Sequence, residues 1–212
     1  MKKFTFILTL VLILNISHVF SSDNFPMGVG PFISLKGGVN AASVPNGVKN
    51  DFAFNPLPDF GVTGYFPLTD KSQFGIAADL AYSTYAFGTK LTNDVTNKTA
   101  YRVSYLSLAP NLYVSGFIIG FNFGLPLNGK AKNTNYISET DIKTDDLAFL
   151  VEIHIGGMIP LFYNETGRLN LILQGGYALT GLYNDNRDFN PHPASASVGI
   201  GYIFNIMDYF DY

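Results

Sequence analysis

Apolar and non-apolar residues alternate in eight segments of this chain. In the segment 147–159, one parity is apolar and the other is not; the two sets are Leu147, Phe149, Val151, Ile153, Ile155 and Ile159 against Ala148, Glu152, His154 and Gly156. A period of two predicts a β-strand with two unlike faces. In six of the segments the non-apolar face consists mainly of Gly, Ala, Ser, Thr and Asn. A soluble sheet normally carries charge on its wet face, so the pattern predicts a closed barrel with lipid outside and a narrow polar interior.

The other seven segments repeat this pattern along the chain: 30–42, 59–68, 73–87, 100–115, 117–127, 169–183 and 194–204. Most are about 10 to 15 residues long, which suits tilted strands that cross a bilayer. The connections alternate between long and short, as in outer-membrane barrels, whose short turns are periplasmic. A two-residue hairpin at Ser115–Gly116 places Val114 opposite Phe117 on the apolar face. We therefore expect an all-β fold, an eight-stranded antiparallel up-and-down transmembrane β-barrel with both termini in the periplasm.

The N-terminus has the pattern of an export signal. Two lysines precede an apolar run, and Val19 and Ser21 stand at the spacing that signal peptidase requires. The run is too short for a comfortable transmembrane helix. We expect residues 1–21 to be a signal peptide and residues 22–212 to form the barrel domain.

Composition excludes several classes of partner and site. Removing residues 1–21 takes away two of the 13 basic residues and none of the 16 acidic ones, which leaves a net charge of −5. That balance argues against a nucleic-acid partner. The chain has no Cys, hence no disulfide and no thiolate metal site. Beyond the N-terminal segment no run of eighteen apolar residues occurs, so an exported membrane protein of this composition is expected to be a β-barrel.

A soluble barrel is the alternative to a membrane barrel for this pattern. A secreted calycin-like ligand-binding barrel also alternates, but it turns its apolar face inward to line a cavity. Its wet face would then carry only about one charge per strand, which is poor for solubility. The chain also lacks Trp, which lipocalins usually carry near the start of the first strand.

Six polar residues on the inward-facing parity form a candidate polar network in the lumen: Lys36, Asp79, Asn122, Glu152, His154 and Gln174. The interior of an eight-stranded barrel is barely wide enough for its own side chains, so charges there must pair. We interpret the set as a structural network that fills the lumen. The functional alternative is a proton or ion pathway through the four ionisable members. A wide water-filled pore is disfavoured, because such pores need about sixteen strands.

A catalytic site is also considered, because Glu152 and His154 share one face of a predicted strand. A metal site or a catalytic triad can use that spacing. No Cys or second His stands nearby, and His192 lies in a separate Pro-rich loop. We therefore expect no enzyme activity, no cofactor and no metal. The connection 128–146 has mixed charge, and we expect a solvated loop with a weak capacity to bind lipopolysaccharide, a host surface or another envelope protein.

One stretch resembles a known family. Ser104-Tyr105-Leu106-Ser107-Leu108-Ala109-Pro110-Asn111-Leu112-Tyr113 resembles the "YLEIPLLLKY"-type strand of the small outer-membrane β-barrel proteins of Gram-negative bacteria (the porin family, OmpA/OmpX-like), and the Gly-rich strand 116–127 is similar to theirs. Ser107 stands where the family often has Glu, and Pro110 is shifted by one position. The resemblance implies a monomer in the cell outer membrane, in contact with membrane lipid and lipopolysaccharide and inserted by the barrel-assembly machinery. It implies no individual role, because the family is defined by architecture.

The end of the last strand is left open by the sequence. Barrels of this class often end on an aromatic residue, and the alternation allows an end near Phe204 or at Tyr212. For the chain as a whole, we predict a porin-like, non-enzymatic protein of the outer membrane with an envelope-structural or surface-interaction role. A conduit for small or hydrophobic compounds is the alternative function.

Overall fold

The computed structural model describes residues 25–69, 74–135, 139–184 and 189–207. The expected signal peptide and Tyr212 lie outside these residues. Within the described ranges, no helix is long and apolar enough to cross a membrane.

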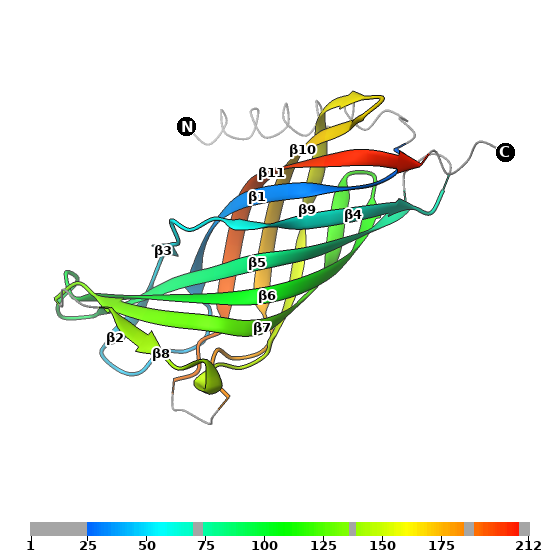
Figure 1. Ribbon diagram of the computed structural model, residues 1–212. Coiled ribbons are helices and arrows are strands. Elements are labelled where there is room, and N and C mark those ends of the chain that lie inside the picture. The colour runs from blue at the N-terminus through cyan, green and yellow to red at the C-terminus, as the bar shows by residue number, and fades with distance from the viewer. Residues whose placement is uncertain (1–24, 70–73, 136–138, 185–188, 208–212) are drawn as a thin grey trace, which may run out of the picture.

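Eight antiparallel strands close into a ring, with the last strand paired to the first (Figure 1). In ring order they are β1 (Met27–Asn40), β4 (Asp59–Pro67), β5 (Phe74–Leu91), β6 (Lys98–Val114), β7 (Phe117–Asn133), β9 (Leu150–Asn164), β10 (Gly167–Ala178) and β11 (Pro193–Met207). The described parts of the connections hold four short elements: β2 (Val48–Asp51), β3 (Ala53–Phe54), β8 (Thr140–Ile142) and the 3₁₀ helix η1 (Thr144–Asp146).

Side chains alternate between the two sides of the wall as the sequence predicts. On β1, Ile33 and Leu35 are each 46% exposed on the outside, whereas Ser34 and Lys36 are buried inside. The outward residues of the other ring strands are apolar in the same way, for example Val62, Leu80, Leu108, Phe121, Ile155, Leu173 and Ile200. The predicted fold class, an eight-stranded antiparallel barrel, is confirmed.

Ser115 and Gly116 form the predicted two-residue turn between β6 and β7. Both have positive φ, 47° and 87°, as a type I′ hairpin requires. The turn pairs Val114 with Phe117, as expected. Because Met27 of β1 pairs with Met207 of β11 at this same end, the described ends of the chain lie beside the short turns.

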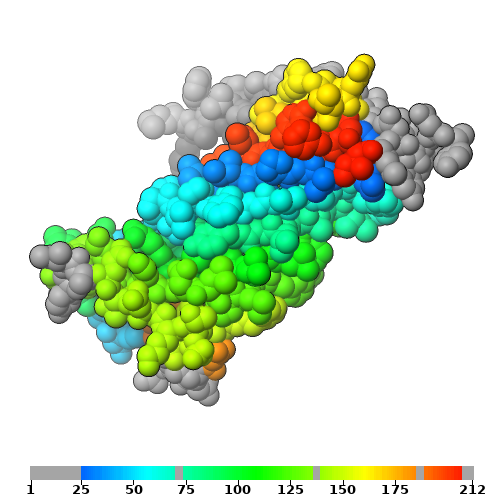
Figure 2. Space-filling view, in the orientation of Figure 1, coloured from blue at the N-terminus to red at the C-terminus, as the bar shows by residue number. Residues whose placement is uncertain are grey.

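At the opposite end, three strands rise beyond the ring. β5 and β6 remain paired as far as Lys90 and Lys98, and β7 continues to Asn133. β2 joins the edge of β5 and β8 joins the edge of β7, which completes a structure that we call the projecting sheet (residues 48–51, 86–91, 98–103, 128–133 and 140–142). Figure 2 shows that it stands clear of the cylinder.

The projecting sheet corrects three expected loops. The residues between the expected strands, 43–58, 88–99 and 128–146, are predicted to be connections, and this is wrong where β2, β5, β6, β7 and β8 occupy them. Beyond the apolar wall the outward side chains are polar, so the apolar outward face that marks a membrane strand ends although backbone pairing continues.

A β-bulge interrupts β7 where the projecting sheet begins. Ser104 pairs with Asn128 and Tyr105 with Pro126, so Leu127 is the extra residue. A bulge changes which parity of the strand faces which side. Odd-numbered residues of β7 therefore face outward up to Leu125, and even-numbered ones face outward from Asn128.

Leu147 does not lie on the outward apolar face as the sequence predicts. It precedes β9, which begins at Leu150, and it is 2% exposed. Leu147 bridges to Tyr183 in the long connections, so strand parity does not set its direction. The last strand also differs from the shorter expectation, because β11 runs past Phe204 to Met207.

The closing seam between β1 and β11 can be tested by cross-linking. Leu35 and Val198 are directly paired, so Leu35→Cys/Val198→Cys should form a disulfide, which is visible as a mobility shift on a non-reducing gel. The native chain has no Cys to interfere.

The matched control for the seam is Leu35→Cys/Leu173→Cys. Leu173 pairs with the other side of Val198 and so lies two strand spacings, about 10 Å, from Leu35. Equal cross-linking of both pairs, or none at the seam, would contradict the closed ring.

Candidate functional site

The lumen has three layers, and the layers can be followed along single strands. On β6, Tyr113 belongs to an apolar cluster beside the short turns, Asn111 and Ser107 lie in a polar middle, and Tyr105 belongs to a second apolar cluster beside the long connections. The first cluster contains Tyr65, Ala77, Tyr113, Ile118, Met158 and Ile203. The second contains Tyr85, Phe87, Val103, Tyr105, Leu147, Leu150, Ala178 and Leu182. The polar middle therefore lies between two apolar clusters.

A cavity of about 40 Å³ lies in the polar middle. That volume holds a few water molecules and nothing larger. All six residues of the sequence-predicted lumen set line it: Lys36, Asp79, Asn122, Glu152, His154 and Gln174.

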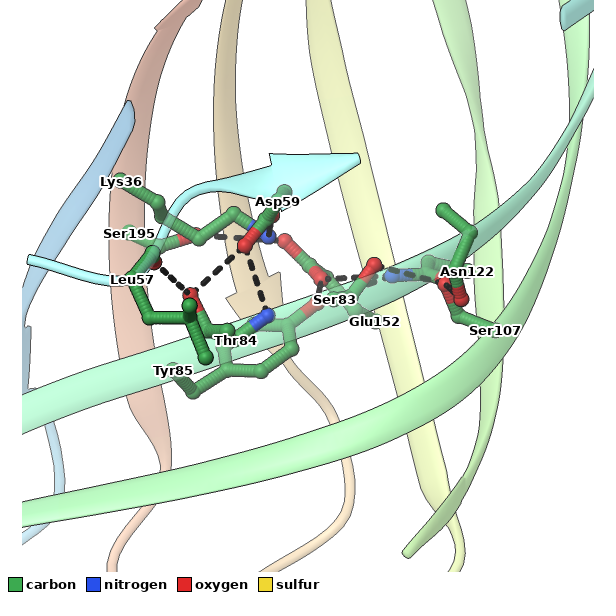
Figure 3. Close-up of polar contacts among 11 residues, drawn as sticks. Lys36, Leu57, Asp59, Ser83, Thr84, Tyr85, Ser107, Asn122, Glu152 and Ser195 are labelled. Atoms are coloured by element: carbon green, nitrogen blue, oxygen red, sulfur yellow. Dashed lines mark hydrogen bonds and ion pairs between the residues drawn. The ribbon is translucent and has the colours of Figure 1, made fainter. Parts of the chain in front are cut away.

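Lys36 and Asp59 form a buried ion pair at this cavity, with 2.6 Å between Nζ and Oδ2 (Figure 3). Asp59 also accepts hydrogen bonds from the backbone N–H of Thr84 at 2.7 Å and from its hydroxyl at 2.6 Å. The ammonium of Lys36 lies 4.3 Å from the ring centroid of Tyr85, a cation–π contact. Both charges are thus compensated by short contacts within the wall.

Glu152 accepts hydrogen bonds from three other strands. Its donors are the hydroxyl of Tyr85 on β5, the amide of Asn122 on β7 at 3.4 Å and the hydroxyl of Ser195 on β11 at 3.4 Å. The Asn122 amide also donates to the Tyr85 hydroxyl at 2.9 Å. Because Tyr85 contacts both Lys36 and Glu152, these residues form one branch of the network.

A second branch begins at Asp79. Its carboxylate accepts hydrogen bonds from Thr63 at 2.7 Å and from the Asn111 amide at 3.1 Å, and the Asn111 carbonyl is hydrogen-bonded to His154 Nε2. Gln174 lines the cavity with no side-chain hydrogen bond to a described residue. Glu152 and His154, which the sequence places on one face, thus belong to different branches.

The described residues contain no group of three His, Asp or Glu side chains arranged for a metal ion. His192 lies apart from the lumen network, with Nδ1 bonded to the carbonyl of Ala178 at 3.0 Å. The arrangement can hold charge and a little water in a fixed geometry.

Sequence reasoning missed three lumen residues. Asp59 stands at the boundary of the expected strand 59–68, and Tyr85 lies in the expected strand 73–87; neither belongs to the predicted lumen set. Arg168 adjoins a turn, but it is 2% exposed, and its guanidinium carbon lies 4.1 Å from the ring centroid of Tyr65 and 4.3 Å from that of Phe25. Each shares the parity of an inward neighbour, Thr63 for Asp59, Ser83 for Tyr85 and Asn170 for Arg168, and this parity is sufficient to place them inside.

Glycine positions in the wall make room for the long polar side chains, and this gives a test. A Cβ on Gly176 would overlap the carboxyl group of Glu152, so Gly176→Ala should destabilise the barrel by about 1–3 kcal/mol. Gly175→Ala is the matched control, because its Cβ would face outward with its nearest neighbour, the Ser195 carbonyl oxygen, 3.8 Å away. Urea titration of the folded band on an unboiled gel measures both. Equal effects would contradict the assigned position of Glu152.

The buried ion pair gives a second test. Lys36→Met leaves the Asp59 carboxylate without its cation, which should lower the free energy of unfolding by about 3–5 kcal/mol. Lys36→Met/Asp59→Asn removes both charges and should restore most of that loss. The stability lost in the double variant is compared with the losses in Lys36→Met and Asp59→Asn alone. If it equals their sum, the two residues do not stabilise each other.

Comparisons with known proteins find structural neighbours but no family match. No protein-family model matches the chain, and no curated protein matches it. Among solved structures, the chain is similar to Ail, the attachment invasion locus protein of Yersinia pestis, at 13% identity and a TM-score of 0.43, over 84% of this chain and 99% of that one. Neisserial surface protein A is 8% identical with a TM-score of 0.43, over 85% and 97%. The outer membrane protein OprG from Pseudomonas aeruginosa is 12% identical with a TM-score of 0.38, over 86% and 99%.

Proposed function

We propose that this chain is an integral outer-membrane β-barrel protein, porin-like in architecture and non-enzymatic, with an envelope-structural or surface-interaction role. The observation that carries the proposal is the distribution of apolar and polar side chains between the outside and the inside of the ring. The outer wall is apolar on every ring strand, and the interior has a polar middle between two apolar clusters.

The outer wall supports a lipid environment. Ile155 is 62% exposed and Phe117 61% exposed, and they belong to a belt that surrounds the ring. Soluble monomers rarely expose apolar patches of more than a few hundred Å². The calycin-like alternative requires this face to line an internal cavity, and the structure turns it outward instead.

The ring supports a monomer of bacterial outer-membrane type. Every ring strand has two neighbours, so the wall has no free edge to recruit a second chain. The short turns and both described chain ends lie at one end, which is periplasmic in such barrels. Membrane lipid, lipopolysaccharide and the barrel-assembly machinery are the partners that this placement requires.

A conduit is the second candidate function. A groove of about 460 Å³ on the outer wall, at Gly157 and Leu173, reaches Gln174 and Ser197, which also line the lumen cavity. A hydrophobic compound that passed from the lumen through the wall into the membrane would need such a groove. The apolar clusters on either side of the polar middle, its small cavity and the separation of the polar network into two branches favour the structural role over transport.

The proposal is tested by localisation and mobility. Membranes from cells expressing the full chain should retain the protein until detergent is added, and the unboiled protein should run faster than the boiled one on a denaturing gel. Recovery of the folded protein from the periplasm without detergent would overturn the proposal.

A conductance measurement separates the two candidate functions. In planar bilayers we expect no stepwise current from the structural protein, since only a few waters fit the cavity. Regular single-channel steps from the purified barrel would favour the conduit.

A further inference from the structure

Basic residues are concentrated on one face of the projecting sheet. Of the 11 basic residues that follow residue 21, six lie there, although the chain as a whole is acidic: Lys49, Lys90, Lys98, Arg102, Lys130 and Lys132. This concentration is not explained by the lumen or by the apolar wall.

Backbone register places all six on the same side. Lys49 of β2 pairs with Lys90 of β5, which pairs with Lys98 of β6. Arg102 pairs with Lys130, and Ala100 pairs with Lys132. Cross-strand partners share a face, so the six form a continuous surface that we call the basic face.

The basic face continues the lipid-facing wall upward. On β6 the outward parity runs from Leu108 and Leu106, both exposed, through Ser104 to Arg102. Arg102 lies four residues, about 13 Å, beyond Leu106 along the strand, which is about 10 Å in height for a tilted strand. This is the level at which lipid headgroups meet a barrel.

The bulge at Leu127 directs two of the lysines to this face. Without the extra residue, Lys130 and Lys132 would have the parity of Gly124 and face the inner side. The inner side is apolar: Phe87 belongs to the second apolar cluster of the lumen, and Tyr101 stacks on it with 4.9 Å between the ring centroids. Only the outward side is therefore available to a charged partner.

Positive charge on this face is only partly neutralised within the chain. Asp51 bridges Lys90 and Lys98 at 2.9 and 3.0 Å, and hydrogen bonds from these two lysines hold the pKa of its carboxyl below the ordinary value. Glu139 bridges Arg102 and Lys130 at 3.4 and 3.5 Å.

The remaining charges leave an excess of cations. In the described part of the chain, Lys49 and Lys132 have no ion pair, and the one further acid opposite this face is Asp141, the cross-strand partner of Lys130. Like charges placed directly opposite on neighbouring strands destabilise a sheet. A local arrangement that costs stability is expected where it serves function.

We propose that the basic face binds the phosphate groups of lipopolysaccharide in the outer leaflet beside the barrel. The proposal rests on the outer-membrane location proposed above. Lysine and arginine are the side chains that bind phosphate by charge and hydrogen bonding, and the face lies directly above the lipid-exposed wall. A glycolipid whose acyl chains pack on that wall brings its phosphates to this height.

The test uses the full chain in detergent micelles with fluorescently labelled lipopolysaccharide, in the presence of a chelator that removes divalent cations. Lys49→Gln/Lys132→Gln removes two charges that form no ion pair with a described residue and should weaken binding about thirtyfold. Lys49→Arg/Lys132→Arg keeps the charges and should bind like the native protein. Lipopolysaccharide stripped of its phosphates should bind the native protein as weakly as the Gln variant binds the intact lipid.

Several results would overturn the inference. Binding unchanged in the Gln variant, or unchanged by removal of phosphate, would sink it. Tight binding of soluble dextran sulfate that displaces the lipid would reassign the face to a soluble polyanion. Heat-dependent mobility of both variants shows that they fold, and native protein that fractionates with the outer membrane while failing this test removes the inference but not the proposed function.

Discussion

A hydrocarbon environment offers no hydrogen bonds, and this constraint accounts for most of the molecule. Each backbone N–H and C=O within the lipid must find its partner in the protein, so a sheet in a membrane has to close on itself. The pairing of β1 with β11 over the length of both strands satisfies that requirement. Once the ring is closed with eight strands, the apolar side chains of the wall face outward, toward the lipid.

Closure at eight strands in turn determines the interior. The space is so narrow that Gly176 must lack a side chain for Glu152 to fit, and charges such as Lys36 and Asp59 lie within 2.6 Å of each other. Burying ions is costly unless they are paired and hydrogen-bonded, which explains why nearly every charged group in the polar middle has several partners. The apolar clusters above and below keep water from screening these contacts. The lumen is in this sense a small polar core rather than a passage.

Sequence alone predicted the parts of the fold that depend on the lipid. A strand with lipid on one side and a narrow lumen on the other must alternate, so Ile33, Val62 and Leu108 could be placed outside from spacing alone. It failed where the lipid no longer acts: in the projecting sheet both faces are polar or covered, and at Leu147 the chain has left its strand. Parity places the six lumen residues inside, and it would place Asp59 and Tyr85 there as well. Which of these side chains contact one another depends on strand stagger, which the sequence does not reveal.

The seam between β1 and β11 has a consequence for how the chain reaches its folded state. Asn40 pairs with Pro193, so the contacts that complete the wall join residues from opposite ends of the sequence. Contacts of such high sequence separation make folding slow. Until the last strand arrives, the first one has an unpaired edge and an uncovered apolar face, a combination that favours aggregation. The nascent protein therefore depends on being kept apart from its own copies for as long as its two ends have not met.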